Sequence, residues 1–183
     1  MTGRVSRVVA LIGLASALVA GCSEKAEMEE QQLQQMEDRI RSWPSAEDTQ
    51  RTLIDMSAEM AAAISGRVPG FEFERSGSVG PAPCGEYHRN RIGAVATTIP
   101  SLSVVEPIPD AAWPGVHDAV RAIAAAHGFS DSTALADKPG SRIARFFDGT
   151  GSEITVGYIK ATVISGQTGC RLRADGGAAT TTR

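Results

Sequence analysis

The sequence predicts an α+β protein in which helices pack on one face of an antiparallel sheet of about four to five strands, a two-layer sandwich. Three segments, near residues 31–43, 45–65 and 110–127, place apolar residues at helical spacing. Other segments alternate apolar and polar residues, as strands with one wet face do. Short turns rich in Gly and Pro join the later segments, which favours antiparallel pairing.

Residues 1–21 are expected to form a lipoprotein signal peptide. Arg4 and Arg7 precede a short apolar run that ends in the sequence LVAG, directly before Cys22. The run is shorter than the roughly 20 apolar residues that a membrane-spanning helix needs, whereas a basic start and a short apolar stretch are typical of secretory signals. Gly21 suits the cleaving peptidase, and the thiol of Cys22 is the predicted attachment point for diacylglycerol, with acyl chains such as palmitate. Cys22 is therefore the predicted lipidation site.

This anchor predicts a protein held at the cell membrane, on its extracytoplasmic face. The chain of 183 residues carries 18 Lys+Arg against 21 Asp+Glu. Such a balance argues against a nucleic-acid partner, because phosphate binding needs clustered positive charge. The expected partners are the membrane, through the acyl anchor, and an envelope protein, with no metal and no cofactor.

Residues 22–30 are Glu-rich without apolar spacing and are expected to act as a solvated tether. Residues 31–173 are expected to form a single α+β domain, and residues 174–183 a disordered tail of Gly, Ala and Thr. The first helix has one apolar stripe, formed by Leu33, Met36, Ile40 and Trp43.

Pro44 ends this helix, and Ser45 is the predicted N-cap of a second one. Its apolar stripe consists of Leu53, Met56, Met60 and Ile64, and the segment 66–70 ends it. A third helix is predicted with Asp110 as its N-cap and Gly128 at its end. The stripe of this helix consists of Trp113, Val116, Val120, Ile123 and His127.

Strands are predicted over residues 71–75, around 92–99, and over 130–136 and 141–147, with a loop over 76–85. Residues 148–151 (DGTG) form the predicted hairpin turn, because Asp and Gly accept the backbone angles of such turns. A long strand is then expected from 154 to 164, followed by a turn over 165–169.

Cys84 and Cys170 are the two cysteines left once Cys22 is acylated, and we expect them to form a disulfide, since the extracytoplasmic compartment is oxidising. The chain-entropy argument gives such a long loop about 4 to 5 kcal/mol of stabilisation. The alternative is a pair of unlinked buried thiols.

Several of these features together resemble the LppA-type lipoproteins of mycobacteria and related actinobacteria. They are the lipobox ending at Cys22, the start of the second helix at Trp43-Pro44-Ser45, the segment Val68-Pro69-Gly70, Cys84, the helix between Asp110 and Gly128, and the stretch from Gly151 to Cys170. The resemblance implies a small cell-envelope lipoprotein from a family without an established enzymatic reaction.

Candidate chemistry is sparse in this sequence. His88, His117 and His127 lack metal-ligand spacing, and a zinc site would require them to converge with a carboxylate such as Glu86. Cys84 and His88 are spaced like a thiolate and its base. We expect the disulfide instead, because a free thiolate is hard to maintain in an oxidising compartment. The serines form no nucleophile elbow, and the Gly149–Gly151 turn lacks the residues of a phosphate loop.

We therefore expect a non-enzymatic binding or scaffold module of the cell envelope. Its contact surface is expected on the uncovered sheet face or on the loop around Pro81 and Glu86. The alternative function is a carrier of a lipid or another hydrophobic ligand, which requires an apolar cavity between the helices and the sheet. An enzyme would instead need a cleft with convergent polar side chains.

Overall fold

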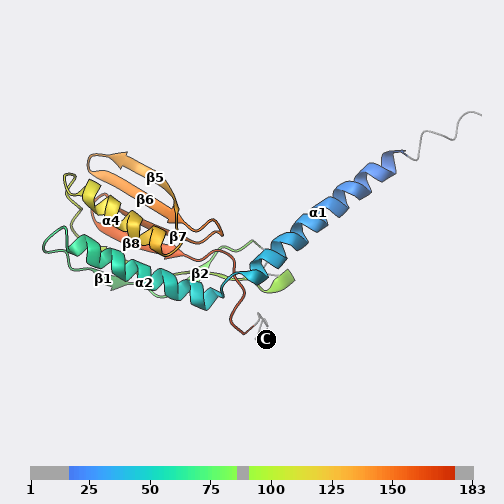
Figure 1. Cartoon of the computed structure of the whole chain (residues 1–183), viewed down its shortest axis with the longest axis horizontal. Helices are drawn as coiled ribbons and strands as arrows, with labels where there is room; N and C mark the ends of the chain where they lie inside the picture. Colours follow the sequence, from blue (N-terminus) through green and yellow to red (C-terminus); the bar gives the residue numbers. More distant parts are fainter. Residues whose placement is uncertain (1–16, 86–90, 176–183) are drawn as a thin grey trace, which may run out of the picture. The chain divides into compact units, whose positions relative to one another are not determined.

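The structure is a computed structural model that describes residues 17–85 and 91–175, with side chains from residue 28 onward. It divides into two compact units, Met1–Arg39 and Ile40–Arg183. The first unit contains most of helix α1 (Ala17–Ser42), and the second contains the remaining elements (Figure 1). In the described ranges, no helix combines the length and the hydrophobicity that a membrane span requires.

Residues 1–16 of the predicted signal peptide and residues 176–183 of the predicted tail lie outside the described residues. The backbone of 22–30, where a tether is expected, is part of α1.

Helix α2 (Ala46–Ser65) begins as the sequence predicts. The Ser45 hydroxyl accepts a hydrogen bond from the Asp48 amide at 3.0 Å, which satisfies one of the unpaired N–H groups of the first turn. The predicted stripe of Leu53, Met56, Met60 and Ile64 is fully buried. Burial of this stripe packs α2 against the sheet.

Helix α4 (Trp113–Ala126) buries Trp113, Val116 and Val120 of its predicted stripe. The prediction of Asp110 as N-cap is wrong, because the cap residue is Ala112 and no side chain caps this helix. Pro114 occupies the first turn, where its missing N–H costs nothing. The Asp110 carboxylate instead binds a turn of the sheet, as described below. Gly128 follows the last turn with φ of +84°, as predicted for the end of this helix.

The described part of the chain contains eight strands in one antiparallel sheet, more than the four to five predicted. The main strand order is β1-β4-β8-β7-β6-β5, while β2 pairs with β3, which joins β8 through Thr98 and Gln167. The strands are β1 (Glu74–Ser76), β2 (Gly80–Ala82), β3 (Ala96–Thr98), β4 (Ser101–Val104), β5 (Asp131–Lys138), β6 (Ser141–Phe147), β7 (Glu153–Tyr158) and β8 (Thr162–Gln167).

The extra strands come from two sources. Strands β1 to β4 have only three or four residues each, too few for a period of two to stand out in the sequence. The predicted long strand over 154–164 is wrong, since residues 159–161 turn the chain between β7 and β8, and residues 165–167, predicted as a turn, extend β8.

Three predictions in the first half of the sheet also need correction. The strand predicted at 71–75 begins only at Glu74, because Phe71 packs into the core after α2. The segment 76–85, predicted as a loop, contains the short strand β2. The strand region predicted at 92–99 has a helical turn at Arg91–Ile92 and becomes extended at β3.

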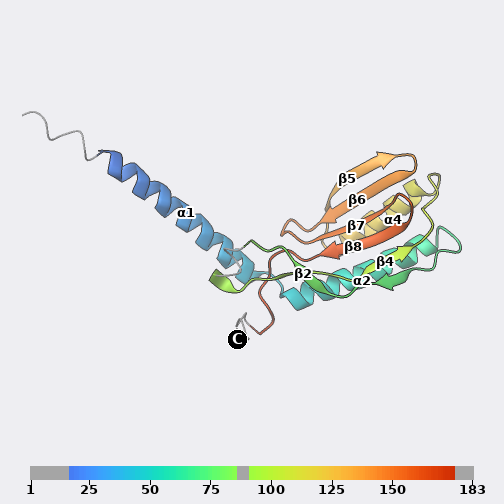
Figure 2. The ribbon, with the colours of Figure 1, turned by 180° about the vertical axis from the view of Figure 1, so that it is seen from behind.

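Helices α2 and α4 lie on the same side of the sheet, and the other side is left open (Figures 1 and 2). The main core lies between these layers and includes Met56, Val116, Phe146, Ile154 and Ile164, each fully buried. The two-layer arrangement of the prediction is therefore confirmed, with helices packed on one face.

Candidate functional site

The predicted lipidation site lies where the structure describes only the backbone. Cys22 is part of α1, and nothing is described of its side chain. Of the predicted zinc candidates, His88 and Glu86 also lie outside the described residues.

The other two cysteines form the expected disulfide. The Cys84 and Cys170 sulfur atoms are bonded at 2.15 Å, and the Cα atoms lie 5.4 Å apart. Cys84 belongs to a second apolar cluster with Ile40, Ile92, Ala94 and Ala96. The disulfide therefore ties the loop after β2 to the segment that follows β8.

Arg171, the neighbour of this disulfide, is 1 % exposed. Its guanidinium donates to the Ser152 hydroxyl at 2.8 Å and to the Thr150 carbonyl at 3.0 Å, and it pairs with Asp148 at 3.3 Å. The Trp43 ring lies 4.8 Å from the guanidinium carbon. Burial lowers the pKa of Arg171, and the Asp148 charge opposes that shift. These contacts fix the segment after β8 against the 148–151 turn, which the sequence predicts.

Gly169 allows this close packing. A Cβ atom there would collide with the Thr150 carbonyl oxygen and with the Arg171 guanidinium.

The two described histidines take separate structural roles. The His117 ring lies 5.7 Å from the Trp113 ring and 6.1 Å from the Phe146 ring, measured between centroids. His127 Nε2 lies 3.1 Å from a Glu59 carboxylate oxygen of α2. Over the described ranges, no three His, Cys, Asp or Glu side chains are grouped as metal ligands would be.

Asp110 is the centre of a polar cluster at the edge of α4. Its carboxylate accepts hydrogen bonds from the Tyr158 hydroxyl at 2.6 Å and from the Gly140 amide at 3.0 Å, and Arg142 lies 3.5 Å away. These partners lower the pKa of Asp110, the Tyr158 bond most of all. Burial and this bond raise the pKa of Tyr158 to about 12. The cluster joins the loop before α4 to strands β6 and β7.

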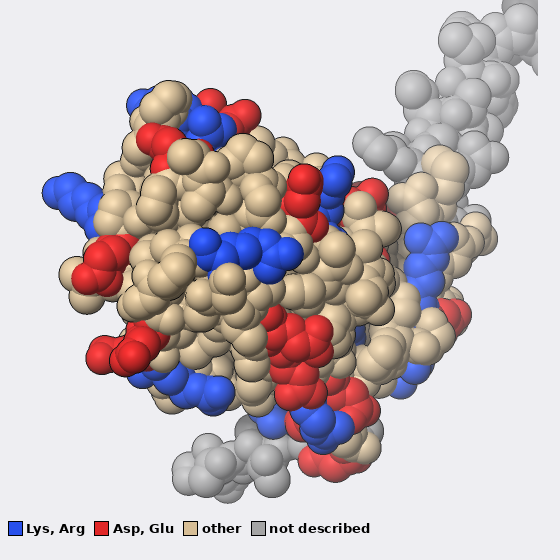
Figure 3. All heavy atoms as spheres, turned by 60° about the vertical axis from the view of Figure 1, so that its left-hand side comes forward, with Lys and Arg blue, Asp and Glu red and all other residues tan. Residues whose placement is uncertain are grey.

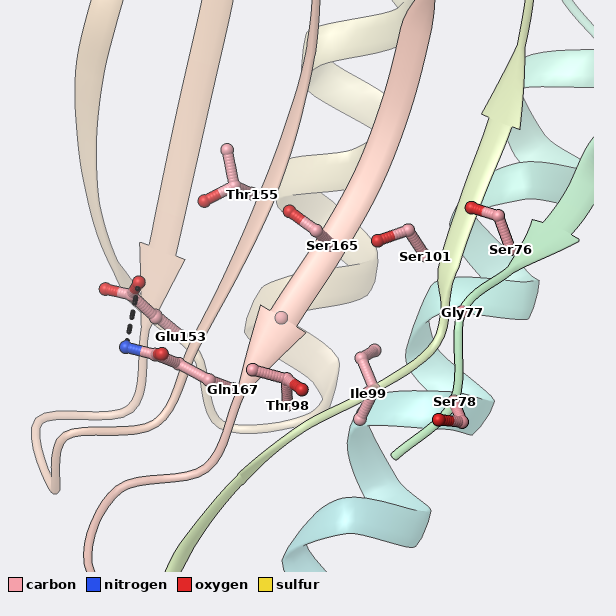
Figure 4. A pocket seen from close by; sticks show the side chains of 11 residues that line it. Ser76, Gly77, Ser78, Thr98, Ile99, Ser101, Glu153, Thr155, Ser165 and Gln167 are labelled. Carbon is pink, nitrogen blue, oxygen red and sulfur yellow. Dashed lines mark hydrogen bonds between the residues drawn. The ribbon is translucent and has the colours of Figure 1, made fainter. Parts of the chain in front are cut away.

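The open face of the sheet carries a line of hydroxyl side chains across four neighbouring strands. Paired residues of antiparallel strands point to the same face. Thr155 pairs with Ser165, and Ser101 pairs with Ser76. Ser101 precedes Leu102, the partner of Ile164, and so lies beside Ser165. Figure 4 shows these four side chains, the hydroxyl row, crossing from β7 to β1 with the helices behind the sheet.

The hydroxyl row crosses a shallow polar pocket of about 360 Å³. Glu153 is the charged residue among the described residues that line it. The Glu153 carboxylate accepts from the Gln167 amide at 3.3 Å and pairs with Arg145 at 3.2 Å. The pocket therefore presents hydroxyl and amide groups together with a carboxylate whose charge is already matched.

An apolar pocket of about 310 Å³ adjoins the polar one on the same face. Both pockets share Thr155 and Ser165 as lining residues. Ile143, Ile159 and Val163 supply the apolar wall, and Ile159 is 56 % exposed. The two pockets together form one trough, polar at the β3 end and apolar at the turn between β7 and β8.

The loop that the sequence also suggested as a contact surface lines a separate groove. Val79, Pro81, Pro83 and Arg173 border this hollow of about 370 Å³ beside the disulfide. The groove is lined by β2 and by residues 94–97 of the neighbouring segment, and Cys84 at its edge is fixed by the disulfide.

The hydroxyl row was not predicted from the sequence. Thr155 lies in the strand predicted over 154–164, but its alignment with Ser165, Ser101 and Ser76 depends on pairing between strands distant in the chain. Only the strand register reveals it.

The comparisons with known proteins agree with this fold. The family of LppA, described as a lipoprotein confined to pathogenic Mycobacterium, matches residues 23–174. The chain belongs to the LppA family. Both the resemblance noted in the sequence and the lipoprotein class are thereby confirmed. No curated protein sequence matches the chain significantly.

Two solved structures are similar to this LppA-family protein. The crystal structure of the lipoprotein LppA from Mycobacterium tuberculosis has a TM-score of 0.63 at 17 % identity, covering 84 % of this chain and 92 % of that one. A DUF4853 family protein from Actinomyces odontolyticus has a TM-score of 0.49 at 12 % identity, covering 74 % and 76 %. At this identity, the similarity to the mycobacterial protein establishes a shared fold.

Proposed function

We propose that this LppA-family protein is a non-enzymatic binding module, anchored by acylated Cys22 at the extracytoplasmic face of the cell membrane, and that the open sheet face is its contact surface. The observation that carries the proposal is the trough on that face. The solvated face of an antiparallel sheet is usually polar, whereas this one carries a row of hydroxyl side chains next to exposed Ile and Val side chains, with Glu153 and Lys160 as the charged residues of the described lining.

Among the described residues that line the trough, Glu153 and Lys160 are charged, and Glu153 pairs with Arg145. Figure 3 shows a different side of the molecule, where side chains of both signs are interspersed with uncharged surface. We expect recognition by the trough to depend mainly on shape, hydrogen bonds and apolar contact.

The alternative function, a carrier of hydrophobic cargo between the layers, receives less support. A carrier needs an apolar cavity between the helices and the sheet. That space holds the main core, in which Leu53, Met56, Phe146 and Ile154 are each fully buried.

Site-specific photocrosslinking in cells tests the proposed contact surface. A photoreactive amino acid replaces Ser103 on the open face, and the matched control carries it at the exposed Asp55 of α2. We expect a discrete adduct from position 103 that is absent at position 55 and is lost when Ser165→Arg fills the trough. Equal adducts from both positions, or none at position 103, would contradict the proposal.

The anchor has a separate test. Cys22→Ser is expected to release the protein from the membrane fraction and to abolish labelling by a radioactive fatty acid. Retention in the membrane fraction, with no label on the unaltered protein, would exclude acylation of Cys22.

A further inference from the structure

The lining of the trough changes from polar to apolar side chains along the strands. Its polar half is lined by the hydroxyl row, Gln167 and Glu153, and its apolar half by Ile143, Ile159 and Val163. Thr155 and Ser165 line both halves, so a single ligand can contact both at once.

The polar half suits an uncharged group that carries several hydroxyls. Each Ser or Thr hydroxyl can both donate and accept, and so can each hydroxyl of a sugar or polyol. Neighbouring members of the row are one strand apart, about 4.8 Å, so two adjacent hydroxyls can bond to opposite sides of one sugar ring. Because Arg145 already pairs with Glu153, the half offers no unmatched charge to an ionic group.

The apolar half suits a short alkyl segment. Gly157 forms part of its lining, and a Cβ atom there would lie 2.7 Å from Ile143 Cα and 2.9 Å from Ile143 Cγ1. The missing side chain lets Ile143 lie close over the strand. Val163 is 38 % exposed and Ile159 is 56 % exposed, so both retain apolar surface that a ligand would cover.

We propose that the open face binds a neutral amphiphile, with a hydroxylated head such as a sugar in the polar half and an alkyl chain in the apolar half. This inference rests on the proposed function, because it names the class of ligand for the same face. Lys160 lines the outer end of the apolar half, so an anionic amphiphile bound in the opposite direction is the competing outcome of the test.

The experiment uses the acylated full chain in phosphatidylcholine vesicles. The probe is octyl glucoside with a diazirine at the end of its alkyl chain, used far below its micelle concentration, and the labelled peptides are identified by mass spectrometry. We expect labelling of peptides that contain Ile143, Ile159 or Val163. Unlabelled octyl glucoside is expected to compete, and hexyl glucoside less well, with at most about a fourfold loss of affinity for each methylene removed.

Two variants separate the halves of the trough. Val163→Lys places a charge in the apolar half and is expected to reduce labelling at least about fivefold, since a buried unpaired ammonium is costly. Thr155→Val keeps the shape but removes a hydroxyl, and a loss of about threefold or more is expected from one unmade hydrogen bond. Leu135→Lys on β5 is the matched control, because Leu135 is 49 % exposed and lines neither half.

Labelling that is unchanged in both Val163→Lys and Thr155→Val would overturn the inference. Stronger competition by laurate or octylphosphocholine than by octyl glucoside would also overturn it. If the probe fails to label the trough while photoreactive position 103 still gives its adduct in cells, the amphiphile is wrong and the contact surface stands. If both fail, both proposals fall.

Discussion

The two faces of the sheet are built by the same strands but have different compositions. On β7, the residues that face the helices are Ile154, Val156 and Tyr158, each at most 2 % exposed. Glu153 and Thr155 alternate with them and lie half-buried on the open face. The helix-covered face contributes to stability through burial, and the open face is the contact surface that we propose. Under this proposal, alternation along one strand separates the residues used for folding from those used for recognition.

The largest expected effect uses two neighbouring phenylalanines of β6. Phe146 is fully buried beneath the helices, while Phe147 is half-buried on the opposite face. We expect Phe146→Ala to lower the free energy of unfolding by about 4 kcal/mol, because it leaves a cavity in the core. Phe147→Ala is expected to cost less than about 1.5 kcal/mol. Urea denaturation followed by circular dichroism measures both, and similar losses would remove the distinction between the faces.

A smaller effect is expected where the segment after β8 packs on the turn between β6 and β7. Arg171→Ala removes the cation that Asp148 and Trp43 surround and leaves the Asp148 carboxylate partly buried. We expect a loss of about 3 kcal/mol in the free energy of unfolding. Arg173→Ala is the control, since Arg173 is exposed, and it is expected to change stability by less than about 0.5 kcal/mol. Equal losses in the two variants would mean that the buried network contributes nothing specific.

Tyr158 brings a polar hydroxyl to the helix-covered face, where its side chain is buried. Its hydrogen bond to Asp110 lowers the pKa of that carboxyl below 3.8. The resulting stabilisation is present above pH 3.8 and is lost as the pH falls through the lower folded-state pKa. The pKa of Tyr158 is raised from 10.0 to about 12, so its contribution is complete below pH 10 and is lost as the pH rises toward 12.

Tyr158→Phe therefore makes a prediction at both ends of the pH scale. We expect a loss of about 1 kcal/mol at neutral pH and a weaker dependence of stability on pH in both ranges. Thermal unfolding followed across these ranges checks the result. An unchanged acid dependence would show that other groups hold Asp110 in its charged form.

Elements with complete local signals could be predicted from the sequence. Helix α2 has its Ser45 cap and its stripe, and the 148–151 turn has Gly149 and Gly151 at positive φ. In each case the deciding residues lie within a few positions of one another. Local propensity and burial then point to the same structure.

Features that depend on distant contacts could not be predicted. Asp110 resembles an N-cap locally, yet Tyr158 and Gly140 compete successfully for its carboxylate. The turn at 159–161 lacks Gly, Pro, Asn and Asp, so the sequence offered no sign that β7 ends there. The hydroxyl row has the same origin, because no short segment of the chain contains more than one of its members.

The smallest stability effect is expected within the hydroxyl row itself. Thr155→Val and Ser165→Ala keep the shape of the open face and leave the buried core untouched, so we expect each to change the free energy of unfolding by less than about 0.5 kcal/mol. Ser57→Ala on α2 is a useful contrast, because Ser57 is 3 % exposed and its hydroxyl donates to the Ile54 carbonyl at 2.7 Å. If the open-face hydroxyls prove to stabilise the fold by more than 1 kcal/mol, they are retained for folding, and the division of labour between the two faces is wrong. If they do not, the hydroxyls remain available for the ligand that we propose.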